Sequence, residues 1–204
     1  MTALKRAGIA PNDISHVVLS HLHGDHFGGL PYLVLDGQFS RRETPLTVLG
    51  PAGTADRLRD AMETSFPRSA GVQRRFEIRV VEVTPGASFA GPAGATFSFV
   101  PVDHASGADA HAIRLRWHEK VIAYSGDTAW TEGLIDVSRD ADLFVCEAYF
   151  RERRVPYHLS YAELAERSNE LSCRRLILTH MTPEMLNAEG IEFERAFDGL
   201  VIEI

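Results

Sequence analysis

The chain has 204 residues, of which 45% are hydrophobic and 24% are charged, as in an ordinary globular protein. This length fits a single domain over residues 1–204, and the formal net charge of −7 disfavours a general nucleic-acid-binding surface. No stretch is long and apolar enough to span a membrane, and Met1–Arg6 has no apolar signal core, so the sequence predicts a cytoplasmic protein without a membrane partner.

Apolar spacing predicts the elements of the first part of the chain. A strand is expected at 17–19, and apolar residues at helical spacing predict a helix over 27–39. The next expected elements are a strand at 46–49, a helix that opens at Gly50–Pro51 and runs to about residue 66, and a strand at 76–83.

In the second part of the chain, strands alternate with helices. Strands are expected at 95–102, 113–117, 121–124, 142–147, 175–179 and 200–202, and helices at 130–137, at 160–171 and from Pro183 onward. Ser160 and Glu163 form a capping-box pattern at the start of the second helix. The early strands are expected to pair as hairpins. This mixture is typical of two sheets with helices outside them.

Cys146 and Cys173 lie in apolar settings and are expected to be buried free thiols.

The stretch His21–His26, with the sequence HLHGDH, directly follows the apolar run 17–19. It places three histidines and one carboxylate within six residues, a density that favours zinc-type metal binding. His21 and His23 can bind one ion, while Asp25 and His26 can turn toward a second. The alternative is a polar turn that holds these histidines by chance.

HLHGDH resembles the HxHxDH signature of the metallo-β-lactamase superfamily, and further landmarks follow in that family's order. They are His104 in VDH, Asp127 in YSGDT and His180 in LTH. Cys146-Glu147-Ala148 and His158-Leu159-Ser160 resemble segments of the branch that contains ribonuclease Z and related phosphodiesterases. The resemblance implies an α/β fold, the four-layer αββα sandwich.

The beginning of the chain is short for this family, whose members usually have several strands ahead of the first histidine motif. Only 20 residues precede His21. The resemblance therefore implies a sandwich that lacks N-terminal strands. A late start codon, a truncated chain and a partner chain that covers the exposed sheet edge are three open explanations.

The resemblance also implies a dinuclear site with two divalent metal ions. His21, His23 and His104 would hold one ion, Asp25, His26 and His180 the other, and Asp127 would bridge both, opposite a bridging water. Zinc is the first expectation, and manganese or iron also suits mixed histidine and carboxylate ligands.

His158 and Asp25 are the expected catalytic residues. In the resembled branch a histidine at the position of His158 faces the substrate, where it would donate a proton to the leaving group. Asp25 would orient the nucleophilic water. Glu147 resembles a residue that bonds a metal ligand or His158, and Ser125 or Thr128 is expected to supply supporting hydrogen bonds.

Four further residues lie outside the expected ligand and catalytic sets. Asp103 either orients a metal ligand or lies on the surface. His16, His111 and His118 match no landmark and are expected to be structural or exposed.

Metal-dependent hydrolysis of a phosphodiester in a small or nucleotide-like anionic substrate is the leading functional hypothesis. Processing of transfer RNA is disfavoured because the chain is acidic and only 23 positions separate His104 from Asp127, which leaves no room for the long Gly/Pro-rich arm of ribonuclease Z. Alternatives are hydrolysis of a lactone, thioester or sulfate, and a metal-binding protein without turnover. Homo-oligomerisation stays open.

Overall fold

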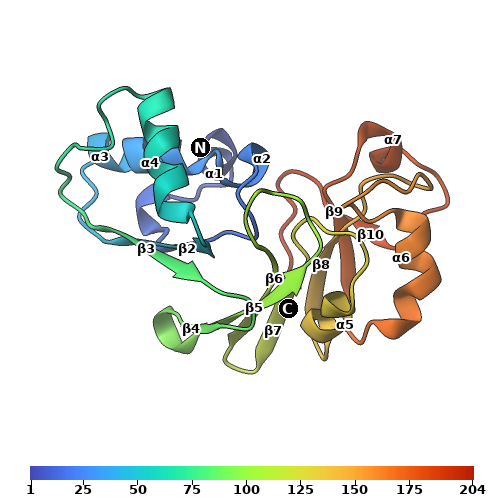
Figure 1. Cartoon of the computed structure of the whole chain (residues 1–204). Helices are drawn as coiled ribbons and strands as arrows, with labels where there is room; N and C mark the ends of the chain where they lie inside the picture. The colour runs from blue at the N-terminus through green and yellow to red at the C-terminus, as the bar shows by residue number, and fades with distance from the viewer. The chain divides into compact units, whose positions relative to one another are not determined.

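The computed structural model describes all 204 residues, and the chain forms two compact units (Figure 1). Unit 1 comprises residues Met1–Val83 and Ser106–Ala108, and unit 2 comprises Thr84–Ala105 and Asp109–Ile204. No helix in either unit combines the length and the apolar character that crossing a membrane requires.

Unit 1 contains a three-stranded sheet in the order β1-β2-β3, and all its strands are parallel. The strands are β1 (His16–Val18), β2 (Leu46–Pro51) and β3 (Ile78–Val83). The expected hairpin pairing of these early strands is therefore wrong. Parallel neighbours need a crossover, and the helices between the strands provide it. The helices of unit 1 are α1 (Thr2–Arg6), α2 (Gly24–Phe27), α3 (Leu30–Phe39) and α4 (Thr54–Ser65).

Two helix boundaries differ from the expectation. The helix predicted over 27–39 begins only at Leu30, as α3, with Pro31 in its first turn, where proline is well tolerated. Gly28 and Gly29 separate it from the short helix α2, which was not predicted. Gly50–Pro51 belongs to the end of β2 instead of opening a helix. The chain then turns at Gly53, whose φ of 88° suits glycine, and α4 begins at Thr54.

The core of unit 1 forms where α3 and α4 pack on the sheet. Val34 of α3, Leu58 and Met62 of α4, and Leu46 and Val48 of β2 are buried in one cluster. Leu58 and Met62 are one helical turn apart, so they lie on the same face of α4, and this is the face that the helix buries.

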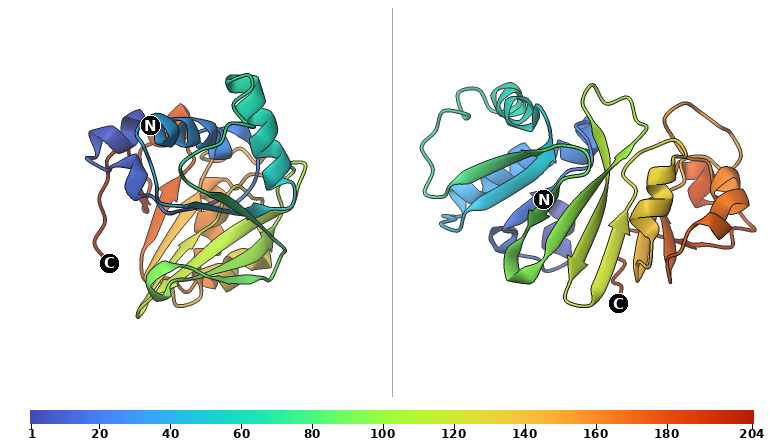
Figure 2. Two further views of the ribbon diagram at one scale, coloured as in Figure 1. Left: turned by 90° about the vertical axis from the view of Figure 1, so that its left-hand side faces the viewer. Right: turned by 60° about the horizontal axis from the view of Figure 1, so that its bottom comes forward.

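Unit 2 contains a seven-stranded mixed sheet in the order β10-β9-β8-β7-β6-β5-β4. Strands β4 to β7 pair as antiparallel hairpins, which run side by side in the right view of Figure 2, while β7 to β10 are parallel. The strands are β4 (Ser88–Ala90), β5 (Thr96–Val102), β6 (Ala110–Trp117), β7 (Lys120–Tyr124), β8 (Leu143–Glu147), β9 (Leu176–Thr179) and β10 (Glu194–Arg195). Hairpins therefore occur among strands β4 to β7 of unit 2, and not between the strands of unit 1.

The helices of unit 2 are α5 (Glu132–Ser138), α6 (Tyr161–Arg167) and α7 (Pro183–Leu186). At the N-cap of α6, Ser160 Oγ accepts a hydrogen bond of 3.3 Å from the Glu163 backbone N–H, which is one of the two hydrogen bonds of the predicted capping box. The strand expected at 200–202 is wrong, since those residues form no regular element, and the edge strand is β10 instead. Neither β4 nor β10 was predicted, because both are short and largely exposed.

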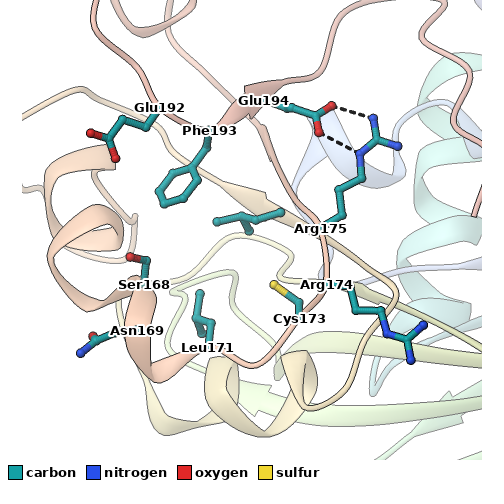
Figure 3. Close-up of a pocket in the computed structure, with 10 residues that line it drawn as sticks. Ser168, Asn169, Leu171, Cys173, Arg174, Arg175, Glu192, Phe193 and Glu194 are labelled. Carbon is teal, nitrogen blue, oxygen red and sulfur yellow. Dashed lines mark hydrogen bonds and ion pairs between the residues drawn. The ribbon is translucent and has the colours of Figure 1, made fainter.

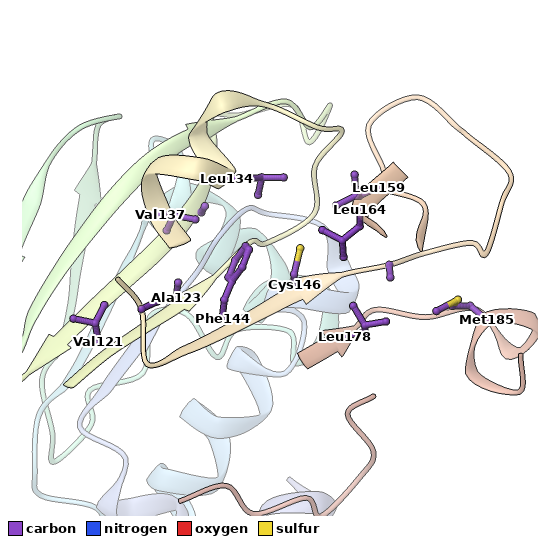
Figure 4. Packing of buried hydrophobic residues seen from close by; sticks show 13 residues of the cluster. Val121, Ala123, Leu134, Val137, Phe144, Cys146, Leu159, Leu164, Leu178 and Met185 are labelled. Atoms are coloured by element: carbon purple, nitrogen blue, oxygen red, sulfur yellow. The ribbon is translucent and has the colours of Figure 1, made fainter. Parts of the chain in front are cut away.

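Side chains of β7, β8 and β9 meet those of α5 and α6 in the core of unit 2 (Figure 4). Phe144, Leu178, Leu134 and Leu164 are fully buried there. Cys146 is also fully buried and reduced, and burial strongly raises the pKa of its thiol. Cys173 is a free thiol that is only half-buried, so the expectation of two buried thiols holds for Cys146 alone.

Replacement of Leu178 by alanine is expected to destabilise the protein by about 2–5 kcal/mol, because the side chain is fully buried and a cavity would remain. Urea unfolding followed by circular dichroism measures this loss. Val201→Ala is the matched control: Val201 is 86% exposed, and its truncation should change stability by less than about 0.5 kcal/mol. Equal losses in the two variants would contradict this assignment of the core.

Candidate functional site

The predicted ligands of unit 1 lie together where the chain leaves β1. The rings of His21 and His26 are 4.0 Å apart between centroids, those of His21 and His23 are 4.9 Å apart, and Asp25 Oδ2 lies 3.6 Å from His26 Nε2. His21 is fully buried and its Nδ1 lies 3.1 Å from Ser20 Oγ, while the Asp25 side chain is 65% exposed. One short segment and the first turn of α2 thus concentrate three imidazoles and a carboxylate.

The predicted residues of unit 2 gather around Asp127, whose carboxylate is almost completely buried. Its Oδ2 lies 3.4 Å from His180 Nε2 and 4.0 Å from both His104 Nε2 and His158 Nδ1. Asp127 follows β7 after a turn at Gly126, which has a φ of 60°. His180 directly follows β9 with a φ of 52°, a conformation that non-glycine residues adopt mainly at special sites.

Glu147 is the fully buried last residue of β8, and its carboxylate contacts three other segments of unit 2. Its Oε1 accepts a hydrogen bond from the Thr128 backbone N–H, and its Oε2 lies 3.0 Å from His158 Nδ1 and 3.5 Å from His180 Nδ1. The Glu147 backbone N–H donates to Ser125 Oγ over 2.9 Å. The contact with His158 that the resemblance implied is therefore present.

The Glu147 carboxylate raises the pKa of His158, chiefly through their hydrogen bond. Burial of the imidazole opposes this shift, the charge of Asp127 adds to it, and His180 counteracts it. An imidazole held by a buried carboxylate keeps its proton to a higher pH, which suits a group that donates a proton near neutrality.

The supporting residues of unit 2 behave mostly as expected. Ser125 and Thr128 contact Glu147, and Thr128 Oγ1 also accepts a hydrogen bond of 3.1 Å from the Asp103 backbone N–H. The Asp103 residue itself is exposed, so of its two expected roles the surface position is the one observed.

Two tyrosines of unit 2 contact the predicted histidines and are absent from the residues predicted from the sequence. The Tyr157 carbonyl lies 2.9 Å from His104 Nδ1, which fixes the orientation of that imidazole. Tyr149 stacks on His158 and on His180, with centroids 4.5 Å and 5.1 Å away. The only sequence signal for Tyr149 was its place two positions after Glu147.

The three histidines that matched no landmark have structural or exposed positions, as predicted. His16 is half-buried beside Ser15 Oγ, and His118 is exposed in the turn between β6 and β7. His111 is fully buried in β6 with its ring edge-on to Phe99, and burial lowers its pKa.

A cavity of about 470 Å³ in unit 2 contains none of the predicted residues (Figure 3). Its wall includes Arg175 at the start of β9, the opposite end of that strand from His180. Arg175 donates two hydrogen bonds to Glu194, of 2.8 and 2.6 Å, so these two charged groups of the cavity wall pair with each other. The predicted residues of unit 2 therefore lie outside this cavity and gather around Asp127 and Glu147.

Comparison with known proteins identifies the family. A family model described as "Beta-lactamase superfamily domain" matches residues 2–181. Ribonuclease Z of Geobacillus kaustophilus is 29% identical over 231 residues, which cover 85% of this chain and 72% of the relative. Ribonuclease Z of Mycobacterium sp. (strain KMS) is 30% identical over 198 residues, which cover 87% of this chain and 69% of the relative.

Among solved structures, human tRNase Z, short form, has a TM-score of 0.79 at 22% identity, covering 100% of this chain and 84% of that one. YhfI of Bacillus subtilis, a metallo-β-lactamase fold protein, has a TM-score of 0.74 at 19% identity, covering 96% and 80%. The α/β fold of metallo-β-lactamase type predicted from the sequence is thereby confirmed. The chain belongs to the beta-lactamase superfamily, and its curated relatives include enzymes named ribonuclease Z.

Glutamine in place of Glu147 is expected to lower the pKa of His158 in the metal-free protein, because the carboxylate that stabilises the imidazolium is lost. Titration of the imidazole signals by NMR, in protein treated with a chelator, measures the change. In the parent protein the pKa of His158 is higher in the folded state than in the unfolded state. The pairing therefore stabilises the fold below the usual pKa of 6.5, and this stabilisation is lost as the pH rises through the folded-state pKa.

Glu166→Gln is the control for this titration, because Glu166 is an exposed carboxylate that pairs with Arg154. It should leave the His158 titration unchanged. An unchanged titration in Glu147→Gln would instead show that the carboxylate does not govern this histidine.

Proposed function

We propose that this protein is a metal-dependent phosphodiesterase. The observation that carries the proposal is the buried Glu147 carboxylate, which holds His158 beside Asp127. A proton donor next to a cluster of histidine and carboxylate ligands suits hydrolysis of a phosphodiester, in which the leaving oxygen must be protonated. Membership of the beta-lactamase superfamily, with relatives named ribonuclease Z, supports the same chemistry.

The donor chemistry within each unit fits divalent metal ions. Unit 1 supplies imidazoles and one carboxylate, and in unit 2 ligand atoms of His104, Asp127 and His158 lie within 4.8 Å of one another. We propose that two ions are held by seven residues: His21, His23, Asp25, His26, His104, Asp127 and His180. Zinc is the first expectation for such ligands, with manganese and iron as alternatives.

Bound divalent ions would lower the pKa of a coordinated water and stabilise negative charge on the attacked group. The protein's own residues would supply the remaining steps. The Glu147 contact occupies Nδ1 of His158, so Nε2 is the ring nitrogen left to give a proton to the leaving oxygen. Asp25, whose carboxylate is largely exposed, would accept a hydrogen bond from the attacking water and orient it.

The substrate class is proposed as a phosphodiester of a small or nucleotide-like anion. The net charge of −7 favours a small substrate over extended RNA. Relatives named ribonuclease Z weigh against the expectation that nucleic acid is a disfavoured partner, so RNA is a second substrate to be tested.

Two alternatives remain. The first is hydrolysis of a lactone, thioester or sulfate, which would use the same ligands. The second is a metal-binding protein without turnover. A cytoplasmic location, a single metallo-β-lactamase-like domain over residues 1–204 and homo-oligomerisation all stay predictions from the sequence.

The first test measures metal content by mass spectrometry together with hydrolysis of bis-p-nitrophenyl phosphate. The parent protein is expected to hold about two metal ions per chain and to turn the substrate over. Asp127→Asn should lose metal, because its carboxylate is the proposed bridging ligand. Metal binding without turnover would favour the other ester substrates, and a protein that binds no metal would overturn the proposal.

In the same assay, His158→Ala should keep its metal and lose activity by about 10²–10⁴-fold, the usual contribution of a general acid. His118→Ala is the matched control, since His118 is an exposed histidine in a turn of the same unit. An activity loss in His158→Ala that is no greater than in the control would exclude His158 as the proton donor.

A further inference from the structure

Three nearly parallel rings form a stack in unit 2. Tyr149 lies 4.5 Å from His158 with an interplanar angle of 20°, and 5.1 Å from His180 with an angle of 23°. The two histidines are themselves 5.5 Å apart and inclined by 14°. Each ring therefore packs against both of the others in an offset-stacked arrangement, the geometry that aromatic pairs favour.

The backbone of Tyr149 links the same two loops. Its N–H donates a hydrogen bond of 2.8 Å to the Leu159 carbonyl, directly after His158. Its carbonyl accepts one of 3.0 Å from the Thr182 N–H, two residues after His180. Tyr149 thus contacts both the loop after β8 and the loop after β9, through its backbone and through its side chain.

The stack constrains a motion that the hydrogen bonds leave free. Glu147 Oε2 lies near Nδ1 of both histidines, at 3.0 Å from His158 and 3.5 Å from His180. The contacts of His158 with Glu147 and Asp127 are both at Nδ1, so its ring can still tilt about that nitrogen. His180 is contacted at both nitrogens, because its Nε2 also lies 3.4 Å from Asp127 Oδ2. Packing of Tyr149 against the two ring faces opposes the tilt of His158 and adds to the contacts of His180, and so sets the direction of both Nε2 atoms.

We propose that Tyr149 is a positioning residue, which holds the imidazoles of His158 and His180 parallel and aims them at the reacting group and the metal site. The catalytic part of this inference rests on the proposed phosphodiesterase function, while the positioning part concerns this chain alone. The ring provides the effect, and the phenol hydroxyl has no part in it.

The test compares Tyr149→Leu, which removes the ring, with Tyr149→Phe, which keeps it. Tyr161→Leu is the matched control, because Tyr161 is a half-buried tyrosine of the same unit that packs edge-on to Phe193. Its replacement removes a packed aromatic ring together with a phenol oxygen that accepts a hydrogen bond of 3.1 Å from the Glu192 N–H. It therefore reports the effect of losing a tyrosine that contacts neither His158 nor His180.

The first readout uses the metal-free protein and needs no activity. Carbon-13 relaxation of the imidazole groups measures how far each ring moves. In Tyr149→Leu the order parameters of His158 and His180 should fall, whereas Tyr149→Phe and Tyr161→Leu should keep parent values. Rings as rigid in Tyr149→Leu as in the parent protein would overturn the inference.

The second readout is kinetic and uses the metal-loaded protein with bis-p-nitrophenyl phosphate. Tyr149→Leu should lower kcat tenfold or more with less than a twofold change in KM, because misdirected groups lose transition-state contacts. Tyr149→Phe should restore kcat to within about twofold of the parent value. A Tyr149→Phe variant as impaired as Tyr149→Leu would overturn the inference, since the hydroxyl would then be the active group. A parent protein without turnover would refute the proposed function, and the relaxation measurement would still decide the positioning role.

Discussion

The burial of one charged group, the carboxylate of Glu147, governs the organisation of unit 2. A buried carboxylate is costly unless hydrogen bonds replace the water that it loses. Here one oxygen accepts from the Thr128 backbone N–H and the other lies against the ring nitrogens of His158 and His180. These partners come from the loops after β7, β8 and β9, so satisfying one carboxylate draws three loops together.

The parallel pairing of β7, β8 and β9 makes this convergence possible. Parallel neighbours end at the same edge of a sheet, and the pairing continues to the last residues, since the Ser125 N–H donates to the Val145 carbonyl and the Ala148 N–H to the Thr179 carbonyl. Asp127, Glu147 and His180 therefore emerge side by side. The hydrophobic core beneath them holds the strands in register, so local packing sets the geometry of the polar groups above it.

Sequence patterns succeeded where the signal is local. Alternating or continuous apolar runs identified most strands, and Ser160 with Glu163 located the start of α6. Errors arose where tertiary context decided. The glycine pair between α2 and α3 delays the start of the helix from the predicted Phe27 to Leu30, and the edge strand β10 carries no apolar signal because it is short and mainly exposed. Apolar residues at 200–202 produced a false strand, since an apolar run does not specify a pairing partner.

The sequence by itself determined which residues are the candidates for metal binding and proton transfer. Metal binding requires particular side chains, and a motif that holds several of them at short spacing can be recognised in a sequence. This applies to the dense HLHGDH motif. The resemblance to the family then added His104, Asp127 and His180, and the segments around Glu147 and His158. Only the tertiary structure decided how they meet. The shared Glu147 contact with two histidines and the Tyr149 stack join segments up to 33 positions apart. Such contacts depend on strand order and register, which spacing along a chain does not encode.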